Sequence, residues 1–122
     1  SEQGFKEFME ERIFRPLAMD NTTIKVKQGQ VIPGSSQGYA PNEDGGYVYV
    51  TDFAEAYGAS GVNSTALDMT KWMLNFRDGV VGGMEAIDAL TTRGILTTGD
   101  TTGYALGLGV TKWRGQQLFT HT

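Results

Sequence analysis

The sequence predicts an α+β chain in which helices are combined with short antiparallel strands. Two segments, about residues 2–14 and 65–77, carry apolar side chains at helical spacing. The last stretch, residues 104–122, alternates around an Arg-Gly pair in the manner of a β-hairpin. With 17 glycines and 39% apolar residues, the chain should be folded but rich in loops. Its 122 residues allow one domain at most.

The first predicted helix presents one apolar stripe at positions i, i+3, i+4 and i+8, formed by Phe5, Phe8, Met9 and Ile13. Pro16 cannot continue the helical hydrogen bonds and favours extended geometry at Arg15, so we expect the helix to end near residue 14. The β-branched residues of Thr22–Lys27 then predict a short strand.

The middle of the chain, residues 28–63, is interrupted by glycine and by Pro33 and Pro41. Such a composition excludes long regular elements and favours a surface segment or a loop that serves a site. Within it, Tyr47–Val50 has the composition of a short strand.

The helix predicted over residues 65–77 has the clearest boundaries. Thr65 and Asp68 stand at capping-box spacing, and Gly79 follows the last turn. The expected apolar stripe consists of Ala66, Met69, Met73 and Phe76, with Trp72 beside them. A further helix is expected at about residues 84–90, followed by turns and the terminal hairpin, whose turn is Arg114-Gly115.

Composition excludes several classes of function. The net charge is −4, from 10 basic and 14 acidic residues without a basic cluster, so nucleic acid is not an expected partner. The lack of cysteine excludes disulfides, thiolate nucleophiles and Cys-based zinc sites. No apolar run approaches the ~18 residues of a membrane span. Because the chain opens on Ser1 and stops within an expected strand, it has the features of a fragment.

Three short stretches together resemble one family of serine hydrolases, the class C β-lactamases, DD-peptidases and related esterases. Residues 13–22 are similar to its helix end and Pro-Leu-Gly-Met turn, with Ala18 in place of the usual glycine. Residues 55–58 and 64–72 resemble its Glu-Ala-Tyr-Gly and Ser-Thr-x-x-Asp-Met-x-x-Trp segments, and residues 98–100 fit the lactamase branch. The chain ends on His121-Thr122, with which the family's third catalytic motif begins.

The resemblance implies a partial β-lactamase/transpeptidase-like fold. Residues 1–122 would be a single partial domain lying between the second and third catalytic motifs of its parent enzyme. The nucleophilic Ser-x-x-Lys and the Tyr-x-Asn motif are absent from these residues, so this chain alone is expected to be inactive. The parent would act through an acyl-enzyme on β-lactams, D-alanyl peptides or small esters, without a metal or cofactor. The resemblance also implies a bacterial periplasmic or extracellular location.

Three candidate site residues follow from the same resemblance. His121 holds a catalytic-motif position, Thr122 would bind a substrate carboxylate, and Tyr57 would line the substrate cleft. Taken without the resemblance, a lone histidine near a chain end is usually incidental, and a tyrosine is often a core residue. The stretch after Gly58 also looks longer than in lactamases, closer to the peptidase and esterase branch.

Three further patterns have simpler explanations. Ser36 lies in a Gly-x-Ser-x-Gly match, but Pro33 precedes it and turn residues follow, so the context of a nucleophile elbow is missing. Asn42-Glu43-Asp44 with Asp52 lacks EF-hand spacing and is typical of a solvated acidic turn. Gly107-x-Gly109 lacks the third glycine of a dinucleotide loop and favours a strand under close packing.

Two alternatives to the enzyme remain open at this point. The Gly- and Tyr-rich segment 38–61 could belong to a non-catalytic module that binds peptide or peptidoglycan, and the chain could be a degenerate structural relative. A strand that ends unpaired, with apolar Leu118 and Phe119, also predicts self-association through its edge.

Overall fold

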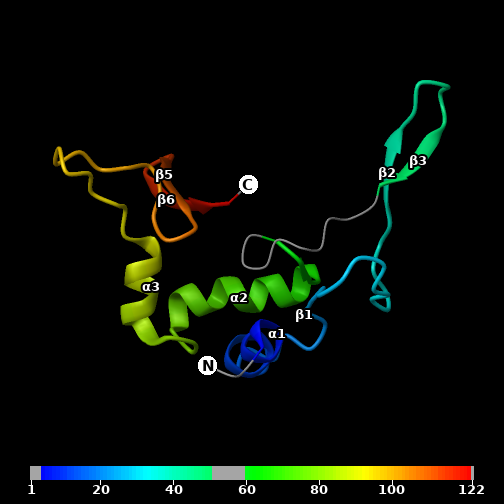
Figure 1. Ribbon diagram of the computed structural model, residues 1–122. Coiled ribbons are helices and arrows are strands. Elements are labelled where there is room, and N and C mark those ends of the chain that lie inside the picture. The colour runs from blue at the N-terminus through cyan, green and yellow to red at the C-terminus, as the bar shows by residue number, and fades with distance from the viewer. Residues whose placement is uncertain (1–3, 51–59, 122) are drawn as a thin grey trace. The chain divides into compact units, whose positions relative to one another are not determined.

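The computed structural model combines helices with two-stranded antiparallel sheets, which confirms the predicted fold class (Figure 1). It describes residues 4–50 and 60–121. The chain divides into two compact units, Ser1–Trp72 and Met73–Thr122, and each is taken by itself below. In the described residues the sheets pair β1 with β4, β2 with β3, and β5 with β6.

The N-terminal helix begins as α1 (Phe5–Met9) and continues as a π-helical turn, η1 (Glu10–Phe14). It ends where the sequence predicts, but not for the predicted reason. Arg15 keeps helical geometry at φ −64° and ψ −48°, so the following proline does not force it into an extended form. A turn over residues 15–18 follows the helix, and the chain reverses at Ala18, which adopts a left-handed φ of 53°.

The turn at Ala18 is a Schellman motif. The Met19 N–H donates to the Phe14 carbonyl at 2.8 Å, and the Ala18 N–H donates to the Arg15 carbonyl at 3.0 Å. This pairing satisfies carbonyls that the end of a helix would otherwise leave unbonded. The site normally favours glycine, because a Cβ makes left-handed geometry unfavourable. Ala18 therefore holds a strained position.

The core of the first unit lies beside this turn. β1 (Thr23–Ile24) pairs with β4 (Val62–Asn63), a strand that the sequence did not predict, and is shorter than the expected strand over residues 22–27. Ile24 is fully buried. Among the described residues of this unit, Phe14, Leu17 and Met19 are also buried and apolar.

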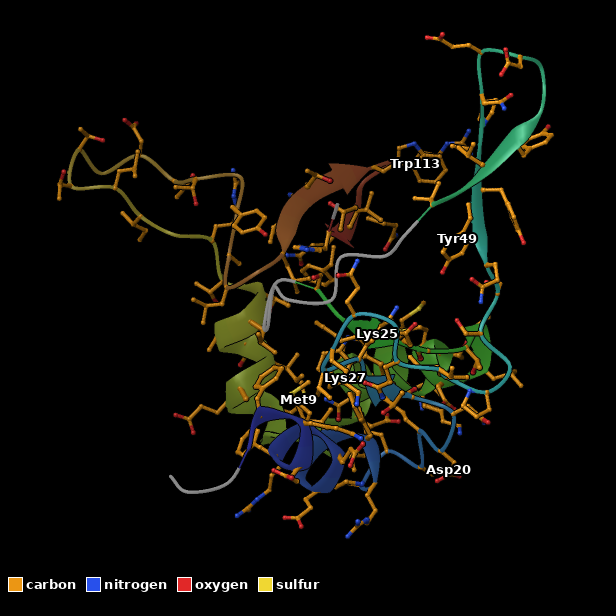
Figure 2. The ribbon with its side chains drawn as sticks, turned by 45° about the vertical axis from the view of Figure 1, so that its right-hand side comes forward. Met9, Asp20, Lys25, Lys27, Tyr49 and Trp113 are labelled. Atoms are coloured by element: carbon orange, nitrogen blue, oxygen red, sulfur yellow. The ribbon has the colours of Figure 1, made fainter. Side chains whose placement is uncertain are left out.

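Within the Gly- and Pro-rich middle segment, the predicted strand β3 (Tyr47–Val50) is confirmed, and it pairs with β2 (Gly38–Pro41). The sequence did not reveal β2, because glycine and proline at its two ends are typical of turns. Both residues are tolerated in a two-stranded hairpin, whose edges need no further partner. Tyr49, labelled in Figure 2, faces Tyr39 edge-on across this hairpin at 6.2 Å between ring centres.

Helix α2 (Ala66–Asp78) confirms the predicted helix, but its buried face is polar. The fully buried positions are Asp68 and Asn75, two turns apart. The predicted apolar stripe is instead exposed in part, with Met69 at 41% and Met73 at 65%. The two polar side chains are buried with their polar atoms paired. Asp68 accepts from a backbone N–H, a hydroxyl and an ammonium group, and Asn75 bonds the N–H and the carbonyl of Val81.

The second unit contains α3 (Gly83–Thr91) and the hairpin of β5 (Gly109–Trp113) and β6 (Gln116–Thr120). The turn Arg114-Gly115 is confirmed, and both residues have the positive φ of a type I′ turn, 49° and 80°. Phe76 and Phe119 stack at 6.0 Å between ring centres. Ile87 and Val110 are the buried apolar residues of this unit.

Replacement of Ala18 by glycine should stabilise the chain by about 1 kcal/mol, because glycine adopts left-handed geometry without a steric penalty. The measurement is the free energy of unfolding in urea. Ala89→Gly, at an exposed position within α3, is the matched control and should destabilise by about 1 kcal/mol. A loss of stability in Ala18→Gly would contradict the proposed strain.

Candidate functional site

His121 directly follows β6, and its imidazole lies against the segment that precedes β5. Nδ1 is 2.9 Å from the Gly107 carbonyl oxygen and 3.3 Å from the Tyr104 hydroxyl. Both His121 and Tyr104 are exposed, so a ligand can reach them. Of the three predicted site residues, His121 is the one that the described residues contain. Tyr57 and Thr122 lie outside them.

A tight turn holds the two partners of His121. Tyr104 and Gly109 form an isolated antiparallel bridge, and the Ala105 N–H donates to the Leu108 carbonyl at 2.7 Å. Gly107 stands in this turn with φ 83°, which favours glycine. The Tyr104 carbonyl accepts from the Gly94 N–H at 3.0 Å, so hydrogen bonds also fix the backbone of the residue that carries the phenol ring.

Gly109 is required for a different reason. A Cβ built there would lie 2.8 Å from the Thr120 Oγ1 of the paired strand. This confirms the interpretation of Gly107-x-Gly109 as a closely packed strand start. Sequence reasoning identified His121 but missed Tyr104 and the Gly107 carbonyl as its neighbours. A Gly-x-Gly pair shortly before a strand predicts the tight turn itself, but its contact with His121 joins residues 14 and 17 positions apart, for which the sequence has no local signal.

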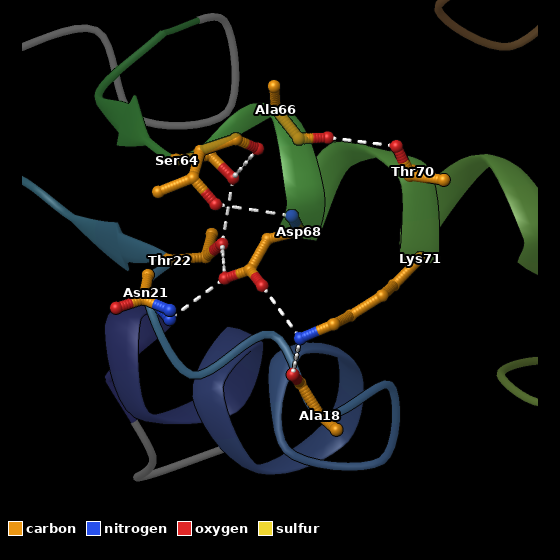
Figure 3. A network of polar contacts seen from close by, with 9 residues as sticks. Ala18, Asn21, Thr22, Ser64, Ala66, Asp68, Thr70 and Lys71 are labelled. Carbon is orange, nitrogen blue, oxygen red and sulfur yellow. Dashed lines mark hydrogen bonds and ion pairs between the residues drawn. The ribbon is translucent and has the colours of Figure 1, made fainter.

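A second polar cluster is centred on Asp68 in the first unit (Figure 3). Its Oδ2 accepts from the Asn21 N–H at 2.8 Å and from the Thr22 hydroxyl at 2.9 Å. Its Oδ1 accepts from Lys71 Nζ at 2.8 Å, and Lys71 also donates to the Ala18 carbonyl. The hydrogen bonds of Lys71, Thr22 and the Asn21 N–H, together with the Lys71 charge, lower the pKa of Asp68 against the opposing effect of burial.

The predicted capping box is therefore only half formed. Thr65 Oγ1 accepts from the Asp68 N–H at 3.2 Å, as the spacing predicts. The Asp68 carboxylate, however, reaches across to residues 21 and 22 instead of back to the start of its own helix. Its role is to connect two segments of the first unit.

This cluster contains a serine and a lysine but does not form a nucleophilic pair. Because a carboxylate only accepts, the Thr22 proton lies on the bond to Asp68, and Ser64 must donate to Thr22 at 2.8 Å. Lys71 Nζ donates to the buried Asp68 carboxylate and to the Ala18 carbonyl, so its hydrogen bonds go to these two groups and not to Ser64. The arrangement is structural.

The Gly-x-Ser-x-Gly match does not form a nucleophile elbow. Ser36 lies in an exposed loop before β2. A nucleophile elbow needs a strand before the serine and a helix after it, and this loop has neither. It borders an open cleft of about 590 Å³ together with Gln28, Gln37 and Tyr49. The structure thus agrees with the sequence-based argument against a nucleophile at Ser36.

The acidic segment after β2 is a hairpin turn. Asn42 Oδ1 accepts from the Gly46 N–H at 2.6 Å, and Glu43 and Asp44 are exposed. The remaining member of that constellation, Asp52, lies outside the described residues. Among residues 4–50 and 60–121, no cluster of three or more His, Cys, Asp or Glu could hold a metal ion. None of the helices in this part of the chain is long and apolar enough to span a membrane.

Comparison with known proteins agrees with the fold and with the resemblance. The β-lactamase family model matches residues 1–122. One solved structure, the octameric penicillin-binding protein homologue from Pyrococcus abyssi, is 23% identical with a TM-score of 0.71. The match covers 93% of this chain and 27% of that one. A search of curated proteins found no match.

The fold is that of part of a β-lactamase or penicillin-binding protein. The chain belongs to the β-lactamase family, since the family model matches its whole length. It spans about a quarter of the length of its structural relative, 27%.

Asp68→Asn should destabilise the chain at neutral pH, because every partner of the carboxylate is a donor and an amide nitrogen would face one of them. The lowered pKa sets the sign of the pH dependence. The carboxylate's contribution is complete at neutral pH and is lost as the pH falls below about 4. The difference in Tm between wild type and variant should therefore shrink on acidification.

Asp44→Asn, which removes an exposed carboxylate from the β2–β3 turn, is the control and should leave Tm almost unchanged at neutral pH. Equal Tm values for wild type and Asp68→Asn at pH 7, or a difference that grows in acid, would show that the carboxylate does not connect the two segments.

Proposed function

We propose that this chain is part of a serine hydrolase that acts through an acyl-enzyme on β-lactams, D-alanyl peptides or small esters. The observation that carries the proposal is the family match over residues 1–122, which ends on His121-Thr122. The fold of the structural relative supports it. A class C lactamase, a DD-peptidase and an esterase are the finer assignments, with a bacterial periplasmic or extracellular location.

In the proposed reaction, a serine hydroxyl oxygen attacks the carbonyl carbon of the substrate, and the leaving amine or alcohol takes up a proton. Water then attacks the acyl-enzyme, releases the acid and restores the serine. The nucleophile belongs to a Ser-x-x-Lys motif, which residues 1–122 do not contain. These residues would supply the substrate contacts and the motif position of His121.

We assign three roles within this proposal. Thr122 donates a hydrogen bond to a substrate carboxylate, and Tyr57 packs against the substrate body. His121 acts at the pocket wall, where its exposure on the second unit supports contact with a ligand. The alternative of a non-catalytic binding module is not favoured, since the match is to a family of hydrolases. The structural relative is octameric, and self-association of this chain stays a prediction.

Covalent labelling tests the reaction class. A polypeptide that joins residues 1–122 to their flanking catalytic motifs should form an adduct with a fluorescent penicillin or an activated ester, on a serine outside these residues. The 122-residue chain alone should form none, because it lacks the nucleophile motif. Peptide mass mapping locates the label. An adduct on Ser36 would overturn the proposal and restore the elbow hypothesis.

Thr122→Val in the complete enzyme should discriminate against substrates that carry a carboxylate. Loss of one donor to a charged acceptor should cost about 1.5–3 kcal/mol in kcat/KM, whereas a neutral ester should be hardly affected. Thr122→Ser keeps the hydroxyl and is the matched control. Equal kcat/KM losses for the charged and the neutral substrate would refute the assigned role.

A further inference from the structure

The contacts of His121 determine which of its ring nitrogens carries the proton. Nδ1 lies 2.9 Å from the Gly107 carbonyl oxygen, a normal hydrogen-bond distance. A carbonyl oxygen has no proton to give, so this contact is favourable only if Nδ1 is the donor. With the proton on Nε2, two lone pairs would instead face each other at that distance.

The second contact does not reverse this assignment. The Tyr104 hydroxyl is 3.3 Å from the same nitrogen, longer than the 2.9 Å to Gly107 and beyond the usual range for a hydroxyl donor. A weak bond from Tyr104 to an unprotonated Nδ1 could not offset the repulsion from the carbonyl. The hydroxyl oxygen is better placed as a second, weaker acceptor of the Nδ1 proton.

The carbonyl is held in place by its own backbone. The Gly107 N–H donates to the Ala105 carbonyl at 3.0 Å, and the Leu108 carbonyl accepts from the Ala105 N–H at 2.7 Å. This turn precedes β5, which pairs with β6, the strand that His121 directly follows. The position of the acceptor is thus fixed before any ligand binds, which is the condition for a positioned catalytic group.

We infer that the Gly107 carbonyl holds neutral His121 as its Nδ1–H tautomer, and thereby makes Nε2 the ring atom that accepts a hydrogen bond from the substrate or the nucleophile. Free histidine in water prefers the opposite tautomer, so the turn reverses the intrinsic preference. Gly107 is a positioning residue in this account. The part concerning substrate rests on the proposed function, whereas the tautomer does not.

The chain is well suited to a direct measurement because it contains a single histidine. Nitrogen-15 NMR under alkaline conditions, where imidazole is neutral, distinguishes a protonated ring nitrogen from an unprotonated one. A cross-strand contact between Val110 and Phe119 verifies that the hairpin is formed. We expect Nδ1–H to dominate in the folded chain and Nε2–H in the same chain in urea. A formed hairpin with Nε2–H dominant would overturn the inference.

Three variants identify the group responsible. Gly107→Ala should raise the Nε2–H share, because φ 83° is unfavourable for alanine and the carbonyl must move. Gly99→Ala carries the same kind of strain at φ 90°, with open space around it, and should leave the tautomer unchanged. Tyr104→Phe should retain Nδ1–H. A similar tautomer ratio in both glycine variants, or loss of Nδ1–H in Tyr104→Phe, would refute the role of the carbonyl.

The consequence for substrate is tested in the complete enzyme. The amide of His121→Asn reaches the position of Nδ1 but presents nothing at Nε2, whereas His121→Gln places an oxygen acceptor near Nε2. We expect kcat/KM to fall about tenfold further in the Asn variant, the effect of one hydrogen bond near the reacting group. Equal losses would overturn the assignment of Nε2. Complete inactivity of the wild-type enzyme on every substrate class would instead refute the proposed function and leave the tautomer intact.

Discussion

The buried carboxylate of Asp68 is the interaction on which the first unit depends. It lies on α2 but bonds the backbone and side chain of residues 21 and 22, which lead from the helix end at Ala18 into β1. A buried carboxylate is costly unless its oxygens are paired, and here an N–H, a hydroxyl and an ammonium donate to it. The segment between the N-terminal helix and β1 is therefore located by electrostatics as much as by apolar packing.

The second unit uses the same principle with an uncharged group. Asn75 Oδ1 accepts from the Val81 N–H at 2.8 Å, and its Nδ2 donates to the Val81 carbonyl at 3.2 Å. This amide closes the turn between α2 and α3 while it is almost fully buried. One face of α2 thus presents polar groups with specific partners, so its orientation is set by directional bonds. A rotation of the helix about its axis would break these directional bonds, whereas an apolar stripe could still pack after a small rotation.

Sequence patterns predicted the elements that local interactions decide. The helix from Ala66, the strand at Tyr47 and the Arg114-Gly115 turn all follow from capping, β-propensity and positive φ, which act within a few residues. The family resemblance came from short motifs in the same way. The strands β2 and β4 escaped prediction because they are short and are stabilised by partners elsewhere in the chain.

The sequence by itself determined the fold class, the family and the candidate histidine, because these depend on periodicity, turn residues and motif order. Only the tertiary structure decided which face of α2 is buried and what surrounds His121. Asp68 was expected to cap its own helix, but it instead bonds Asn21 and Thr22, which lie 47 and 46 positions away in the sequence. Likewise the Gly107 carbonyl meets His121 only because a hairpin folds back. Contacts between distant residues have no local pattern, so three-dimensional structure is needed to find them.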